Sequence, residues 1–313
     1  MINSIMCRLT AVISSKHTLR AKRKLTTLLW SVVRTLLLVG ICYMVLYPML
    51  VRISVAFMTR EDLNDVTVRW VPRHFTLDNM RIAWEKMEFV KALANTTILS
   101  GVVTAISLIA CTLAAYGFAR HKFFGRELLF GLVIFTLVVP PQTNMVPLYM
   151  QFYNYRMLGG MSPFFILAAT CSGIRNGLYI YICRQTFRAM PNEIEEAAIV
   201  DGSGALRTFF TIMLPNAVPT LVTVGLISFV WQWNDTFYST LLSPTMKLLS
   251  SSLVGIVATI TDFFGGNWQN IDFVYASMLI NAGSLLLISP LVLLYLFAQK
   301  SFVQSVERSG IIG

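Results

Sequence analysis

Residues 191–215 read PNEIEEAAIVDGSGALRTFFTIMLP, a polar and acidic segment that is broken by glycine and flanked on both sides by long apolar runs. The whole chain has 313 residues, of which 56% are hydrophobic and only 13% are charged. Its mean hydropathy of +0.66 is far too high for an ordinary soluble domain. We therefore expect an all-α integral membrane protein in which this polar segment lies outside the bilayer.

Local signals predict a helix–turn–helix within this segment. Asn192 is suited to cap the first helix, with Glu195 three residues later to complete a capping box. Gly202 should end that helix, because glycine adopts the left-handed backbone conformation at little cost. Apolar residues at helical spacing then indicate a second helix: Leu206, Phe209, Phe210 and Met213. Pro215 should interrupt this second helix, because proline has no backbone N–H to donate.

Six apolar segments approach the length of a bilayer-spanning helix, which needs roughly 20 residues. They cover residues 28–57, 92–119, 128–150, 163–187, 217–242 and 273–298. Pro140, Pro141 and Pro147 should kink or unwind the outer half of the third segment. The predicted organisation is a basic arm at 1–27, a six-span domain at 28–300 with the polar loop at 188–215, and a tail at 301–313.

The charge distribution predicts the orientation in the membrane. Seven basic residues and no acidic ones lie within the first 34 positions, and a basic arm before an apolar run is typical of the cytoplasmic side. An even number of spans then places both termini in the cytoplasm, together with the loop between spans four and five. The net charge of +10 does not indicate nucleic-acid binding, because no aromatic-interleaved basic patch accompanies it.

The sequence offers little for catalysis or for holding a cofactor. The three histidines are isolated and the five cysteines are scattered singly, so neither a metal site nor a disulfide framework is predicted. No GxxxxGK[ST] nucleotide-binding loop occurs in the chain. We expect no enzymatic activity and no directly bound cofactor, and any ATP would be used by a partner subunit.

The polar loop resembles the EAA loop of the permease subunits of ABC importers. The residues that match its fixed positions are Glu196, Ala197, Ala198, Gly202, Ile212, Leu214 and Pro215. Four other stretches are similar to the carbohydrate-import, maltose-type branch of these permeases: WVPRHFTLDN (70–79), LAAYGFARHKFFGRELLF (113–130), VVPPQTNMVPLYM (138–150) and FVWQWND (229–235). The resemblance covers nearly the whole chain from the first span onward.

This resemblance implies that the loop docks into a groove of a separate ATPase subunit. The residues expected to couple the two are Glu196, Ala197, Ala198, Asp201, Gly202, Leu214 and Pro215. Glu196 would contact a basic residue of the ATPase, and Gly202 would provide the turn. The implied partners are a second homologous permease, an ATPase dimer, an extracellular solute-binding protein and a sugar. The alternative interpretation of the loop is an amphipathic helix pair that rests on lipid.

Polar residues within or near the spans are candidates for the substrate path. They are Arg175, Asn176, Trp233, Asn234, Asp235, Gln142 and Asn144. Arg175 is an ionisable residue inside an apolar run, where it would bind a sugar hydroxyl or an anionic group, snorkel toward the inner interface, or pair with the partner permease. Trp231 is equally well explained as an anchor at the membrane interface.

Two other classes of function are weighed against the sugar permease. An ion-gradient-driven secondary transporter of a small polar solute would carry polar sites in repeated halves, and no convincing internal repeat is present. A membrane-embedded enzyme would need a cluster of ionisable residues, which the sequence lacks. The sequence thus favours a permease subunit of a bacterial importer that passes a sugar or oligosaccharide from an extracellular binding protein to the cytoplasm.

Overall fold

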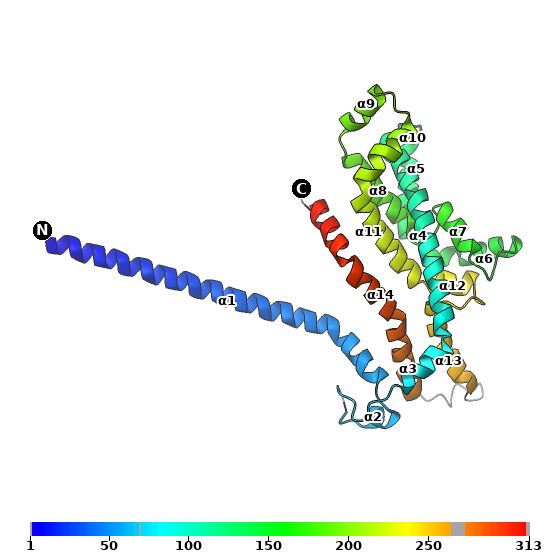
Figure 1. Ribbon diagram of the computed structural model, residues 1–313, viewed down its shortest axis with the longest axis horizontal. Coiled ribbons are helices and arrows are strands. Elements are labelled where there is room, and N and C mark those ends of the chain that lie inside the picture. Colours follow the sequence, from blue (N-terminus) through cyan, green and yellow to red (C-terminus); the bar gives the residue numbers. More distant parts are fainter. Residues whose placement is uncertain (1, 69, 264–272, 311–313) are drawn as a thin grey trace.

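The computed structural model describes residues 2–68, 70–263 and 273–310, with side chains at 26–68, 70–256, 273–297 and 299 (Figure 1). Most side chains of the predicted arm and all those of the predicted tail therefore lie outside the described set. Every regular element in the described residues is helical. In chain order these are α1 (Ile2–Ala56), α2 (Arg60–Asn64), α3 (Asp78–Lys86), α4 (Phe89–Arg120), α5 (Arg126–Val138), η1 (Pro141–Asn144), α6 (Met145–Asn154), α7 (Ser162–Ala169), α8 (Asn176–Ala189), α9 (Asn192–Val200), α10 (Ala205–Thr208), η2 (Phe209–Met213), α11 (Leu214–Trp233), α12 (Phe237–Leu242), α13 (Leu249–Phe263) and α14 (Phe273–Gly310).

Helix α1 presents an apolar surface that the rest of the described chain leaves uncovered. Its stretch Thr26–Ala56 is long and apolar enough to cross a membrane. Figure 1 shows α1 extending away from the other helices and approaching them at its C-terminal end. There Ala56 is buried, and Arg52 donates a hydrogen bond of 3.2 Å to Ser284 of α14. An apolar surface of this size is suited to lipid or to another apolar protein surface.

Three further helices in the described residues can cross a membrane. They are Phe89–Arg120, Ala205–Trp233 and Phe273–Phe297. A fifth candidate is Arg126–Val138 followed by Pro141–Asn154, two parts that are bent by 100° at a short break. Pro140 and Pro141 lie at this break, so the predicted disruption of the third span is confirmed. The described residues thus contain four spanning helices, or five if the bent pair forms one span.

The predicted fourth span at 163–187 is not a single helix. Helix α7 ends at Ala169 and α8 begins at Asn176. Between them, Cys171 (φ 55) and Arg175 (φ 57) adopt the left-handed conformation, which cannot continue a right-handed helix. Neither residue is glycine, so the usual sequence signal for this conformation is missing.

The predicted fifth span at 217–242 is also divided. Helix α11 ends at Trp233, and α12 begins at Phe237. The carboxylate of Asp235 accepts hydrogen bonds of 2.9 Å from both the backbone N–H and the hydroxyl of Ser239, so it stabilises the start of α12. The expectation of six transmembrane helices is therefore not confirmed.

Among the described residues, three hydrophobic clusters hold the bundle together, and α4 contributes buried residues to each of them. Ala92 packs in the cluster formed with α1, α3, α13 and α14. Leu99 lies in the cluster formed with α6, α7 and α12. Ala115 lies in the cluster formed with α5, α8, η2 and α11. Figure 1 shows α9 and α10 at one end of α4 and α2 and α3 at the other, so α4 connects the two ends of the fold.

Candidate functional site

The predicted coupling loop consists of α9, a glycine turn, α10 and η2. The first turn of α9 is acidic, with Glu193 and Glu195, which suits the positive end of the helix dipole. Gly202 has φ +81 and lies directly after the helix. Its N–H donates to Ile199 O (3.0 Å), and the N–H of Ser203 donates to Ala198 O (2.9 Å). The predicted end of the helix at Gly202 is confirmed, with the crossed hydrogen bonds of a left-handed C-cap.

The predicted capping box at the start of α9 is wrong. Pro191 occupies the cap position, and no side chain caps the helix. Asn192 Oδ1 instead accepts a hydrogen bond from Arg120 Nη1. Glu195 accepts a 2.5 Å hydrogen bond from the hydroxyl of Tyr116 and forms a 3.4 Å ion pair with Arg120 Nε. Charge-assisted contacts with Arg120 are stronger than a neutral cap, so tertiary contacts replace the local motif.

Pro215 does not interrupt the second helix, contrary to the sequence prediction. The chain runs from α10 through η2, a short π-helical segment, directly into α11. The N–H of Leu214 donates to Phe209 O, the i→i+5 spacing of a π turn. Pro215 then lies in the first turn of α11, where a missing N–H costs little. The wider turn also buries Phe209 and Met213.

Exposed acidic and apolar side chains together form what we call the coupling surface. It comprises Glu196, Asp201, Ile199, Val200, Leu206 and Phe210. Val200 is 86% exposed and Leu206 is 71% exposed. Exposed apolar side chains of this kind are typical of a surface that contacts another protein or a membrane.

The remaining residues of the predicted coupling set have different environments. Ala197, Gly202 and Pro215 are exposed, whereas Leu214 is half-buried and Ala198 is buried. Within the part of the chain that the structure describes, no hydrogen bond or ion pair holds the Glu196 carboxylate. Glu196 is therefore available to an external cation, whereas Ala198 helps to seat α9 on the bundle.

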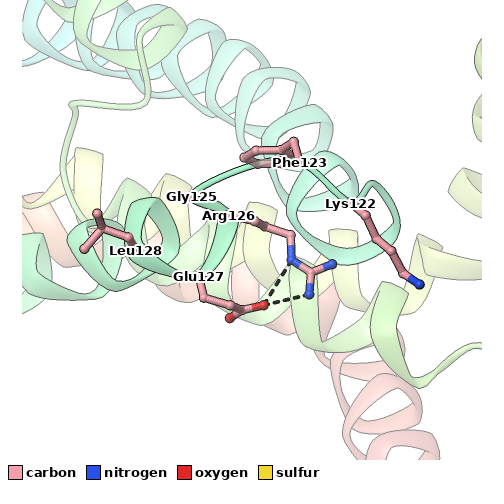
Figure 2. Close-up of a pocket in the computed structure, with 6 residues that line it drawn as sticks. All are labelled: Lys122, Phe123, Gly125, Arg126, Glu127 and Leu128. Carbon is pink, nitrogen blue, oxygen red and sulfur yellow. Dashed lines mark hydrogen bonds and ion pairs between the residues drawn. The ribbon is translucent and has the colours of Figure 1, made fainter.

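The turn between α4 and α5 lies beside this loop and contains a shallow surface depression. Its volume is ≈ 330 Å³, and it is lined by Lys122, Phe123, Gly125, Arg126, Glu127 and Leu128. Figure 2 shows the guanidinium of Arg126 turned toward Glu127, with contacts of 3.0 and 2.8 Å. Glu127 also pairs with Arg184 of α8 at 3.3 Å. The ion pair between Glu127 and Arg184 ties α5 to α8 at the same end of the bundle as α9.

The candidate path residue Arg175 lies at the break between α7 and α8. It is exposed, and its guanidinium carbon lies 4.8 Å from the centre of the Trp231 ring, within the range of a cation–π interaction. Asn176 is buried, and its amide donates to Ala168 O at 3.4 Å. The side chain of Arg175 is thus exposed at the break, whereas Asn176 holds the two half-helices together.

The structure separates the other predicted path residues into two groups. Trp233 is buried and donates to Leu287 O at 3.2 Å, and Asp235 is buried at the start of α12, so both have internal partners. Gln142, Asn144 and Asn234 are exposed. The sequence analysis left Trp231 open between the substrate path and an interfacial anchor; its contact with Arg175, which is distant along the chain, is seen only in the structure.

Comparison with known proteins identifies the family. Residues 106–308, well over half of the chain, match the family described as "Binding-protein-dependent transport system inner membrane component". The chain belongs to this family of permeases. The matched stretch includes the whole coupling surface and the break that carries Arg175. Together with its several apolar helices, membership makes this permease a multi-pass protein of the cell membrane.

Individual relatives support membership of the same family. The permease is 30% identical over 252 residues to the melibiose/raffinose/stachyose import permease protein MelC of Bacillus subtilis, covering 80% of this chain and 86% of that one. It is 26% identical over 279 residues to the arabinooligosaccharides transport system permease protein AraQ of Halalkalibacterium halodurans, covering 87% and 93% of the two chains. A bacterial ABC transporter involved in the import of the acidic polysaccharide alginate has a similar fold, with a TM-score of 0.70, 22% identity and coverage of 88% and 96%.

Proposed function

We propose that this permease is the membrane-spanning subunit of an ATP-driven importer that passes a sugar or oligosaccharide into the cytoplasm. Its family and its relatives named for melibiose, raffinose, stachyose and arabinooligosaccharides support the substrate class. The structural observation that carries the proposal is the coupling surface, which leaves Glu196, Ile199 and Val200 exposed at one end of the bundle. The alternative, an ion-driven secondary transporter, has no use for such a surface.

The coupling surface would bind a separate ATPase subunit. Glu196 would pair with a basic residue of that subunit, and Ala197 would allow its backbone to approach closely. The left-handed turn at Gly202 would orient α9, while Leu214 and Pro215 would hold the π turn that follows. The permease itself would bind no cofactor and hydrolyse no ATP. A dimer of ATPases, a second homologous permease and an extracellular solute-binding protein would complete the complex.

The break between α7 and α8 would lie on the substrate path. Non-helical backbone is tolerated at membrane depth only where it faces protein or a water-filled cavity. Arg175 offers hydrogen-bond donors for sugar oxygens, and Trp231, which is 44% exposed, offers an aromatic face for a sugar ring. Asn234, Gln142 and Asn144 are exposed polar residues that would extend the path. Trp233, Asp235 and Asn176 would act by positioning their neighbours.

The proposed topology keeps six crossings of the membrane. The fourth crossing would use α7, the break and α8 together, in the manner of a discontinuous transport helix. Both termini and the coupling surface would then lie in the cytoplasm, and α2 and α3 at the opposite end of the bundle would lie outside. The basic arm at 1–27 agrees with this orientation.

Co-purification of the detergent-extracted permease tests the proposal. We expect an ATPase subunit and a second permease to accompany the native chain, and Glu196→Ala and Gly202→Pro to weaken or uncouple the ATPase. Gly204→Ala is the matched control, because Gly204 has no positive φ and nothing lies within 4 Å of its added Cβ. A native chain that purifies alone, with uptake in vesicles driven by an ion gradient and insensitive to ATP, would establish the secondary transporter instead.

A further inference from the structure

Helix α9 is fastened to the bundle at its first turn by a small polar cluster, the α9 clamp. We define the clamp as Tyr116 and Arg120 of α4 with Asn192 and Glu195 of α9. One oxygen of the Glu195 carboxylate accepts a hydrogen bond from the hydroxyl of Tyr116 at 2.5 Å, and the other forms an ion pair with Arg120 Nε at 3.4 Å without a hydrogen bond. Arg120 also donates from Nη1 to Asn192 and from Nη2 to the carbonyl of Met190, the latter at 2.6 Å.

The ion pair of the clamp is largely shielded from water, unlike the carboxylates of Glu193 and Glu196. The side chain of Arg120 is 7% exposed and that of Glu195 is 19% exposed. An ion pair that is partly dehydrated and supported by further hydrogen bonds fixes geometry better than an exposed pair does. The neighbouring carboxylates of Glu193 and Glu196 are exposed and have no hydrogen bond or ion pair in the described residues. Glu195 is therefore the acidic residue of α9 that faces inward.

A displacement of α9 would reach α4 through this clamp. Tyr116 and Arg120 form the last two turns of α4, and the ring of Tyr116 packs against Phe187 of α8 and Phe209 of η2, with ring centres 5.6 and 4.9 Å apart. Helix α4 contributes to all three hydrophobic clusters. Because packed interiors transmit strain, force applied at its end acts on the whole bundle.

A second arginine braces the same end of α4 against its neighbours. Arg184 of α8 donates from Nε to the carbonyl of Phe118 at 3.3 Å and pairs with Glu127 of α5. Its guanidinium carbon lies 3.8 Å from the centre of the Phe130 ring. Helices α4, α5 and α8 are thereby joined close to the clamp, so α9 is attached to a braced group of helices and not to one flexible end.

We propose that Glu195 is a positioning residue that transmits the movement of the coupling surface to α4, a role separate from ATPase docking by Glu196. This inference rests on the proposed function, because it presupposes an ATPase that moves α9. It predicts that breaking the clamp leaves the ATPase bound and active while transport per ATP falls. Loss of docking would have the opposite signature, with the ATPase released.

The test uses the whole complex reconstituted in vesicles, with the native chain, Glu195→Gln, Glu195→Ala and Tyr116→Phe. Glu193→Gln and Glu193→Ala are matched controls on the same turn. We measure the ATPase retained after purification, ATP hydrolysis, and sugar taken up per ATP. Glu195→Ala should lower uptake per ATP by about fivefold or more, the scale of a typical coupling energy. Glu195→Gln, which keeps an acceptor for Tyr116, should lose less, and the Glu193 variants should match the native chain.

The outcomes separate this inference from the proposed function. If the native complex contains no ATPase, the proposed function fails. If the native complex is coupled but Glu195→Ala behaves like Glu193→Ala, the transmitting role of Glu195 is wrong. Release of the ATPase by Glu195→Ala would also overturn it, because Glu195 would then act in docking. Tyr116→Phe keeps Arg120 and Glu195 in place, so it tests the clamp even if removal of the carboxylate disturbs folding. The Tyr116→Phe and Glu195→Ala effects should be non-additive when combined.

Discussion

The guanidinium of Arg175 lies over the ring of Trp231, 4.8 Å from its centre, and joins the break in the fourth predicted span to helix α11. Both side chains are exposed in the described structure. An arginine held on an aromatic face still presents its N–H groups at the edge of the guanidinium plane. Under the proposed function, the pair would offer an aromatic face to a sugar ring and hydrogen-bond donors to its oxygens.

If Arg175 binds the substrate, its replacement will distinguish acidic from neutral sugars. Arg175→Ala should reduce the uptake of an acidic oligosaccharide about tenfold more than that of a neutral one, because hydrogen bonds to charged groups are the stronger class. Initial uptake rates in vesicles, with Arg175→Lys as the charge-preserving control, provide the measurement. An equal loss for both substrates would give Arg175 a structural role at the break.

A side chain at Gly202 should strain the turn after α9, whereas a side chain at Gly204 should not. Nothing lies within 4 Å of a Cβ added at either position, but Gly202 has φ +81. Gly202→Ala should therefore cost about 1–2 kcal/mol of local conformational energy, while Gly204→Ala should be close to neutral. Binding of the ATPase to the purified variants measures the difference. Gly202→Asn should recover part of the affinity lost in Gly202→Ala, since asparagine tolerates the left-handed region. Equal affinities of the ATPase for all three variants would contradict this account.

Close packing of α8 on α5 depends on the absence of a side chain at Gly177. A Cβ there would lie 2.7 Å from Thr136 Oγ1 and 3.0 Å from the carbonyl of Val133. Gly177→Ala should therefore destabilise the protein by about 1–3 kcal/mol through overpacking. Gly117→Ala, in α4 with nothing within 4 Å of the new Cβ, should be neutral or stabilising by up to about 1 kcal/mol. Thermal unfolding in detergent tests this order, and a lower midpoint for Gly117→Ala than for Gly177→Ala would refute it.

The loop between α2 and α3 should loosen in acid. The backbone N–H of His74, which donates to Asp62 Oδ2 at 2.9 Å, and then the imidazole at 3.1 Å hold the pKa of Asp62 below its usual range. Because the folded pKa is the lower one, the stabilisation is fully present above the unfolded value of about 3.9 and is lost as the pH falls through the folded value.

Limited proteolysis of this loop in vesicles, from about pH 6 down to about pH 3, would measure the effect with an acid-tolerant protease. Cleavage of the native loop should increase toward the acid end. Asp62→Asn should be cleaved readily across the whole range, whereas Asp78→Asn, which removes an exposed carboxylate, should follow the native profile. A native profile that does not change with pH would show that Asp62 does not hold the loop.

Features governed by neighbouring residues were predictable from the sequence. The end of α9 at Gly202 follows from the preference of glycine for positive φ, and the bend after α5 follows from Pro140 and Pro141. The position of the polar loop between apolar runs follows from composition alone. These predictions needed no knowledge of which helices pack together.

Features that depend on distant residues were not predictable in the same way. The left-handed conformations of Cys171 and Arg175 have no local signal, and neither does the π turn that precedes Pro215. The contact between Glu195 and Tyr116 joins residues 79 positions apart.

Hydropathy and backbone preferences act over a few residues, so they suffice to predict a helical membrane protein with an acidic, glycine-ended loop. Which acidic residue of that loop faces inward, and which is free for a partner, depends on the packing of α9 against α4. Glu195 and Glu196 are adjacent and chemically identical, so the positions of Tyr116 and Arg120 near the end of α4 distinguish them.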